Sequence, residues 1–135
     1  MLMKHFRKLC SDLKVTGYDE RGDRIEMSRQ GFKALLSALL RNSEFDEDWY
    51  LETYPDVRKG IEAGTIADAH DHYVNHGYFE GRLPGLRGFD AETYAELNPD
   101  VVRAIHGASP DARRMALINH FLQFGYKEGR SVQHA

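Results

Sequence analysis

The hydrophobic positions of the first fourteen residues recur with the spacing of an α-helix. The apolar side chains at this spacing are Leu2, Phe6, Leu9, Cys10 and Leu13. They share one helical face and predict an amphipathic helix over residues 1–14. Residues 15–27 break the period, with short apolar segments on either side of a turn at Arg21-Gly22-Asp23. This pattern predicts a small β-hairpin or an ordered loop.

A second apolar stripe follows Ser28, a residue type that commonly caps the start of a helix. Its members are Phe32, Leu35, Leu36, Leu39 and Leu40. The predicted helix ends near Asn42, and its stripe is too apolar to lie exposed on a monomer, so we expect it to pack on the next segment or on another copy of itself. Residues 1–44 are therefore either a cap on a helical array or an assembly element, with the 1–14 helix the better candidate for assembly.

From residue 45 onward, the sequence repeats itself. Residues 45–57 return as 89–101 at an offset of 44, and residues 72–82 return as 120–130 at an offset of 48. Most identical positions are turn or aromatic residues, which makes chance a poor explanation. The chain therefore divides into an N-terminal segment (1–44), a first copy (45–88) and a second copy (89–135).

The residues shared by the two copies are typical of the starts and ends of short helices. A phenylalanine, an aspartate cap and a tyrosine predict a hydrophobic staple at the first helix of each copy, and a proline opens the second helix. Asn98 is a good cap for that second helix, whereas Tyr54 in the first copy is a weak one. The residues assigned structural roles are Phe45, Asp46, Tyr50, Pro55, Asp56, Gly77, Gly81, Phe89, Asp90, Tyr94, Pro99, Asp100, Gly125 and Gly129.

A third helix is expected in each copy, capped by Asp68 in the first and by Ser109 in the second. The second helices should end near Gly64 and Gly107. We expect the third helices to end at Gly77 and Gly125 in the left-handed conformation of a Schellman motif, with Tyr78 packing on Tyr73 and Tyr126 on Phe121. The prediction is an all-α fold: two stacked three-helix repeats with an N-terminal helical cap.

The pattern Phe-Asp-x3-Tyr, Asn/Tyr-Pro-Asp-Val, His-Tyr/Phe and Gly-Tyr-x-Glu-Gly-Arg resembles a bacterial tandem helical repeat over residues 45–132. Such repeats occur in large secreted or surface proteins and are appended to glycosyltransferases of surface-polysaccharide pathways. The resemblance implies a role in bacterial cell-surface or polysaccharide biology, and it brings no catalytic residues with it.

Composition and charge exclude several classes of protein. A net charge of −3 argues against sequence-independent nucleic-acid binding, which requires a clustered basic face. No apolar run is long enough to cross a bilayer, and the lone Cys10 cannot form an internal disulfide. No signal peptide is recognisable, so a cytoplasmic location is expected, with signal-less export left open.

The candidate catalytic and metal-binding residues favour a non-enzyme. His70, His72 and His76 have a spacing that could hold a metal ion, but only His72 has a counterpart in the second copy. A histidine at that place is more typical of a packing and hydrogen-bonding residue. The recurring aspartates suit helix starts, and no nucleophile motif or phosphate-binding loop is present, so we expect no catalysis, cofactor or metal.

Four residues are candidates for contact with a carbohydrate or a partner: Trp49, Tyr54, Arg82 and Arg130. The two aromatic side chains lack aromatic counterparts in the second copy, which favours exposed positions over core positions. The two arginines could instead pair with an aspartate at a helix start. We expect a non-catalytic adaptor that binds a protein, with a possible homo-oligomer through residues 1–42. The alternatives are a carbohydrate-binding module, an assembly subunit or a metal-dependent protein.

Overall fold

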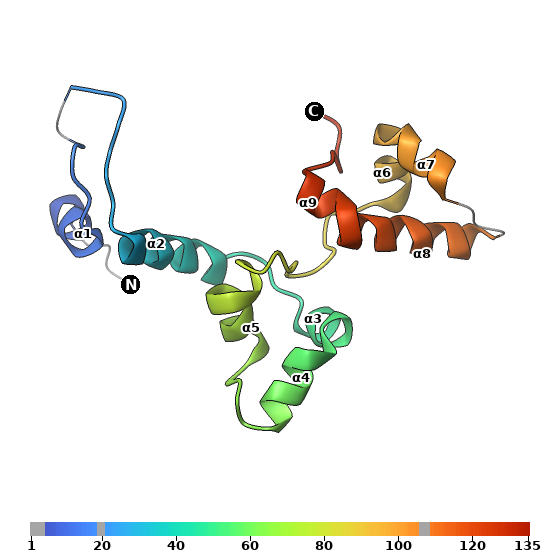
Figure 1. Cartoon of the computed structure of the whole chain (residues 1–135), viewed down its shortest axis with the longest axis horizontal. Helices are drawn as coiled ribbons and strands as arrows, with labels where there is room; N and C mark the ends of the chain where they lie inside the picture. Colours follow the sequence, from blue (N-terminus) through green and yellow to red (C-terminus); the bar gives the residue numbers. More distant parts are fainter. Residues whose placement is uncertain (1–4, 19–20, 106–108) are drawn as a thin grey trace. The chain divides into compact units, whose positions relative to one another are not determined.

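The computed structural model describes residues 5–18, 21–105 and 109–135, and its contacts divide the chain into two compact units (Figure 1). These units are Met1–Gly77 and Tyr78–Ala135. Within the described ranges the regular structure is helical, which confirms the all-α prediction. Residues 15–27 were predicted to form a hairpin or an ordered loop, and among the described residues of this segment Thr16 and Glu26 form an isolated antiparallel bridge. The expected helix end at Gly107 lies outside the described residues.

Two helices of the N-terminal segment lie against each other. Helix α1 spans Phe6–Leu13 and helix α2 spans Arg29–Arg41. Ser28 caps α2 as expected: its hydroxyl accepts a hydrogen bond from the Gly31 amide at 3.0 Å and donates one to the Leu13 carbonyl at 3.3 Å. A Cβ atom on Gly31 would overlap that carbonyl oxygen, so the absence of a side chain lets the two helix backbones meet.

The two copies form corresponding helices, those of the first copy in the first unit and those of the second copy in the second unit, whereas residues 78–88 of the first copy belong to the second unit. The first unit contains α3 (Glu47–Thr53), α4 (Pro55–Glu62), α5 (Ala69–His72) and the π-helical turn η1 (Tyr73–Gly77). The second unit contains α6 (Ala91–Leu97), α7 (Pro99–Ala104), α8 (Pro110–His120), η2 (Phe121–Gly125) and α9 (Tyr126–Glu128). The third helix of each copy thus widens into a π-helical turn at the same place, which the periodicity did not predict.

The first and third helices of each copy start at the caps expected from the sequence. Asp46 accepts a hydrogen bond from the Trp49 amide at 3.0 Å, and Asp90 accepts one from the Thr93 amide at 2.7 Å. The staples form beside them, with ring centroids 5.1 Å apart for Phe45 and Tyr50, and 5.4 Å apart for their second-copy counterparts. Asp68 and Ser109 cap the third helices as well.

The prediction that the Asn98 side chain caps α7 is wrong. Asn98 makes no such cap, and its amide is buried with 6% of the residue exposed. The amide nitrogen donates to the Tyr94 carbonyl at 2.9 Å and to the Ser131 carbonyl at 3.0 Å. These bonds fasten the C-terminal tail to the end of α6, a contact between residues 33 positions apart that local sequence rules do not consider.

The predicted left-handed helix ends at Gly77 and Gly125 are also wrong. Gly125 has helical angles, φ −59° and ψ −40°, and Gly77 is not among the described glycines with positive φ. The left-handed glycines lie four residues later, at Gly81 (φ 79°) and Gly129 (φ 67°). The Schellman pattern appears there, with the Gly129 amide bonded to the Tyr126 carbonyl and the Arg130 amide bonded to the Gly125 carbonyl.

A close approach of a tyrosine explains why Gly77 and Gly125 are glycines. A Cβ atom on Gly77 would overlap the hydroxyl of Tyr50, and one on Gly125 would overlap the hydroxyl of Tyr94. Both tyrosines are fully buried. Glycine is thus required at both positions because the tyrosine hydroxyl leaves no space for a Cβ atom, and not because the backbone is left-handed.

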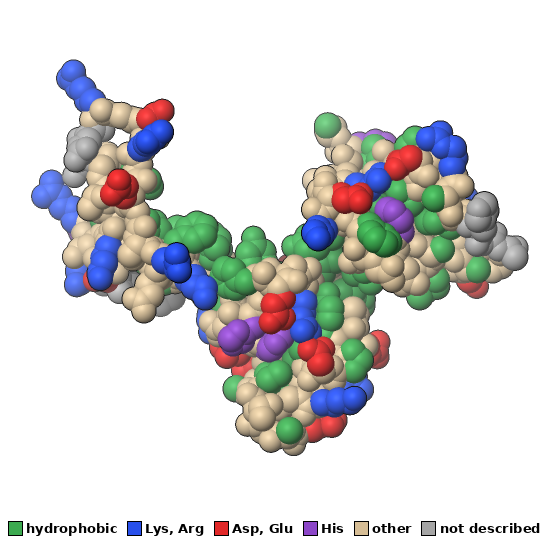
Figure 2. All heavy atoms as spheres, viewed as in Figure 1, with side chains coloured by type: hydrophobic (Ala, Val, Ile, Leu, Met, Phe, Trp, Pro, Cys, Tyr) green, Lys and Arg blue, Asp and Glu red, His purple; other side chains and the backbone are tan. Residues whose placement is uncertain are grey.

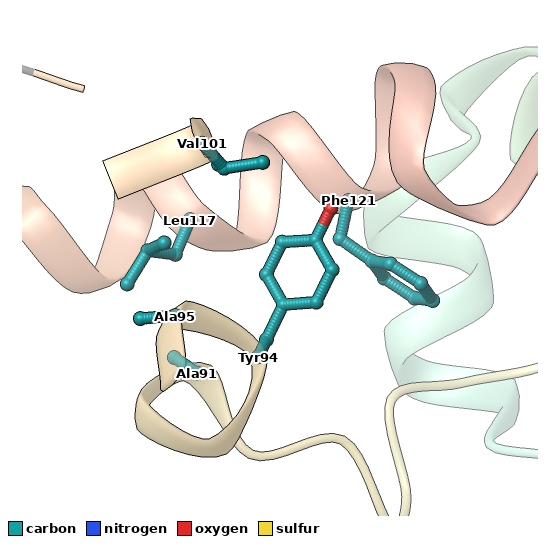
Figure 3. Close-up of a cluster of buried hydrophobic side chains, with 6 residues drawn as sticks. All are labelled: Ala91, Tyr94, Ala95, Val101, Leu117 and Phe121. Atoms are coloured by element: carbon teal, nitrogen blue, oxygen red, sulfur yellow. The ribbon is translucent and has the colours of Figure 1, made fainter. Parts of the chain in front are cut away.

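Each unit has its own hydrophobic core around this tyrosine. In the first unit the buried residues are Tyr50, Val57, Ala69, Tyr73 and Val74. In the second they are Ala91, Tyr94, Ala95, Val101, Leu117 and Phe121, and Figure 3 shows the Tyr94 ring between Leu117 and Phe121. Most of the aromatic side chains shared by the copies therefore serve as core.

Candidate functional site

A tyrosine–histidine pair occupies the centre of each copy. The Tyr50 hydroxyl lies 3.1 Å from Nδ1 of His72, and the Tyr94 hydroxyl lies 3.0 Å from Nδ1 of His120. Burial raises the pKa of Tyr94 above its usual value. Each hydroxyl lies between a histidine ring and a glycine backbone, so we interpret the tyrosine–histidine pair as part of the packing of its unit. The sequence signal for this pair was the recurrence of the histidine in both copies, as His72 and His120.

The other first-copy histidines do not complete a metal site. Within the described residues, no group of three or more His, Cys, Asp or Glu side chains could hold an ion. The rings of His72 and His76 lie 5.7 Å apart. His70 instead stacks on Phe45 at 4.6 Å, and its buried Nε2 has no hydrogen-bond partner.

Arg130 lies in a network with the carboxylates of Asp100 and Glu128 and the side-chain amide of Asn98, whose Oδ1 accepts a hydrogen bond from Nη1 at 3.4 Å. Its Nη1 lies 2.8 Å from Oδ2 of Asp100, and its Nε lies 2.6 Å from Oε2 of Glu128. The hydrogen bond from Arg130 lowers the pKa of the Asp100 carboxyl below its usual value. The pairing of an arginine with an aspartate at a helix start, expected as one alternative, is therefore present. In the first copy, Nε of Arg82 lies 2.9 Å from Oε2 of Glu80.

Trp49 and Tyr54 lie together in the first unit. Their rings meet edge to face with centroids 6.0 Å apart, and both side chains are half-buried against the core of that unit. Tyr54 also meets Tyr50 edge to face at 4.7 Å. The structure therefore brings these two candidates into one cluster and leaves neither ring fully exposed.

A cavity of about 370 Å³ lies in the second unit and includes one of the four sequence candidates, Arg130. The lining is otherwise mainly apolar: Leu83, Leu86, Phe89, Phe121, Tyr126 and Val132, with Gly85, Gly129 and Arg87. Phe89 and Phe121 stack on each other at 4.5 Å along one wall. Sequence analysis missed this cavity because residues 83–89 and 126–132 meet only in the folded unit.

An exposed apolar surface runs along α2. Phe32, Leu35 and Leu39, which we call the α2 strip, are 53%, 38% and 62% exposed. Leu40, at one edge of the predicted stripe, packs against the core of the first unit, and Leu36 is half-buried. Figure 2 shows hydrophobic side chains along one edge of α2 and lysine or arginine side chains along the other.

Comparisons with protein-family models, with curated proteins and with solved structures gave no match for this chain. Within the described residues, no helix has the length and apolar character needed to cross a membrane.

Proposed function

We propose that this chain is a non-catalytic adaptor that binds another protein, with the cavity of the second unit as its contact site. The observation that carries the proposal is the chemistry of the cavity wall, formed mainly by leucine, valine and aromatic side chains. A wall of this kind suits an apolar side chain of a partner, because burial of apolar surface is the main source of affinity. Arg87 and Arg130 add two charged groups to the lining.

The arrangement of the polar groups supports a binding role over catalysis. The buried tyrosine hydroxyls contact histidines of their own copy, and Arg130 contacts Asp100 and Glu128. These contacts give each group a structural role without a reaction. The resemblance to the bacterial repeat supports a place in cell-surface or polysaccharide biology, and we keep the cytoplasmic location expected from the sequence.

Carbohydrate binding is the alternative that the site has to be tested against. Sugar rings stack on open aromatic faces, whereas Trp49 and Tyr54 are half-buried and pack on each other. A cavity with few polar side chains also offers few partners for sugar hydroxyls. These observations favour a protein as the ligand.

Site-specific photocrosslinking in cells tests this proposal. A photoreactive amino acid at Val132, in the cavity wall, should capture one discrete protein. The same group at Arg103, an exposed residue of α7, serves as the matched control and should not capture it. Identical products at both positions, or no protein product at Val132, would contradict the proposal. A polysaccharide adduct at Trp49 would favour the carbohydrate alternative instead.

A further inference from the structure

The N-terminal helices have amphipathic patterns but almost no buried residue. In α1 no residue is buried, and in α2 only Gly31 is. Phe6 of α1 is 47% exposed, in addition to the three residues of the α2 strip. Short helices are only marginally stable in water unless their apolar face is buried. We therefore expect a binding partner to cover this surface.

The apolar residues of the α2 strip lie on one face of the helix. Phe32, Leu35 and Leu39 are three and seven residues apart, which aligns them along a single line of the helix. The close approach of Gly31 to Leu13 fixes α2 against α1 on a neighbouring side.

The charge of this part of the chain is opposite to that of the rest. Residues 1–42 contain nine Lys and Arg against five Asp and Glu, a net charge of +4. Residues 43–135 contain nine against 16, a net charge of −7. Helix α2 has no acidic residue and carries Arg29 and Lys33 beside the strip, with Arg41 paired to Asp71 at its end.

These observations identify the chemistry of the occupant. A second copy of the same face would bring basic side chains together without acidic residues of α2 to pair with them. The strip is also small, on the order of 300 Å² for three half-exposed side chains, whereas a stable protein interface needs about 800 Å² from each partner. An anionic bilayer has no such minimum of matched area, accepts Phe and Leu side chains at its surface, and attracts Lys and Arg.

We propose that the α2 strip and its flanking basic residues dock on a membrane surface that contains anionic lipid. The helix lies in the plane of the interface, with Phe32, Leu35 and Leu39 in the boundary between headgroups and acyl chains. Arg29 and Lys33 lie at the level of the lipid phosphates. The residues of the α2 strip belong to the first unit and the residues of the cavity to the second, so the two proposed surfaces share no residue.

Vesicle flotation with the full chain tests this proposal. Vesicles of phosphatidylcholine with about 30% phosphatidylglycerol should carry the protein, and vesicles of pure phosphatidylcholine should not. The double variant Leu35→Gln/Leu39→Gln keeps the charge and should weaken binding roughly tenfold, because it removes the inserted apolar side chains. Arg29→Gln/Lys33→Gln should also weaken binding and reduce its dependence on salt. The matched control is Met115→Gln, at an exposed methionine of α8, which should bind like the unaltered chain.

Three outcomes would overturn the inference, once circular dichroism shows that the variants keep the unaltered helix content. Failure of the unaltered chain to float with anionic vesicles is the first. Flotation that is insensitive to Leu35→Gln/Leu39→Gln but abolished by salt would mean charge adsorption without docking of the strip. A dimer in light scattering that Leu39→Gln dissociates, with no vesicle binding, would make the strip a self-association surface.

Discussion

The contact between Tyr94 and Gly125 gives the sharpest prediction about this fold. Gly125 has helical backbone angles, so replacement by alanine should stabilise the turn by up to about 1 kcal/mol on helix propensity alone. However, the added Cβ atom would overlap the Tyr94 hydroxyl and lie 3.1 Å from Cδ2 of Phe121. Both rings belong to the buried core of the second unit.

The steric cost is expected to exceed the propensity gain. Overpacking a core costs about 1–3 kcal/mol. Displacement of the Tyr94 ring also disturbs its 3.0 Å hydrogen bond to His120, which contributes about 1 kcal/mol. We therefore expect Gly125→Ala to lower the free energy of unfolding by about 1–3 kcal/mol, a loss of several degrees in Tm.

A double-mutant cycle isolates the responsible atom. Tyr94→Phe deletes the hydroxyl that the new methyl group would strike, so Gly125→Ala should cost much less in that background than in the unaltered chain. Thermal and urea unfolding followed by circular dichroism at 222 nm measures all four proteins. Gly22→Ala is the control, since a Cβ atom there meets nothing within 4 Å. Strictly additive effects, or a Gly125→Ala variant at least as stable as the parent, would refute the reasoning.

Three further predictions follow from other contacts. His70→Ile places at this position the residue type of its second-copy counterpart, Ile118. The change should raise the free energy of unfolding in urea by about 1 kcal/mol, because it removes a buried Nε2 that has no hydrogen-bond partner. A lower free energy of unfolding would contradict this. The ion pair with Arg130 lowers the pKa of Asp100 in the folded chain. The stabilisation from this ion pair is therefore present above the ordinary carboxyl pKa near 4 and is lost as the pH falls through the lower pKa of the folded state. Asp100→Asn should flatten the dependence of Tm on pH in that acid range, and an unchanged dependence would count against this prediction. Asn98→Ala should release the C-terminal tail and speed amide hydrogen exchange at residues 131–132, together with a loss of about 1–3 kcal/mol.

Local sequence signals predicted the helix starts well and the helix ends poorly. An aspartate or serine cap acts on amides three residues away, so Asp46, Asp90 and Ser109 could be assigned from their neighbours alone. A glycine is ambiguous, because both a left-handed turn and a close contact select it. At Gly125 the contact decides, and its partner Tyr94 is 31 residues away in the sequence.

The candidate site shows the same limit of sequence reasoning. Arg130 was identifiable because it recurs in both copies next to a glycine. Its neighbours in the cavity, such as Leu86 and Val132, lie outside the repeated motifs and carry no local signal. The exposure of Leu39 was not predictable either, since an apolar stripe fixes which residues share a face but not what covers that face.

The most direct test of the proposed binding role is amide chemical-shift mapping on the full ¹⁵N-labelled chain. The protein captured by the photoreactive group at Val132 and a surface polysaccharide are titrated in separate experiments. We predict that the protein shifts resonances within residues 83–89 and 126–132, the two segments that contribute most of the cavity lining, and that the polysaccharide shifts none. Shifts at Trp49, Tyr54 and Arg82 on addition of polysaccharide, without any effect of the protein at the cavity, would contradict the account.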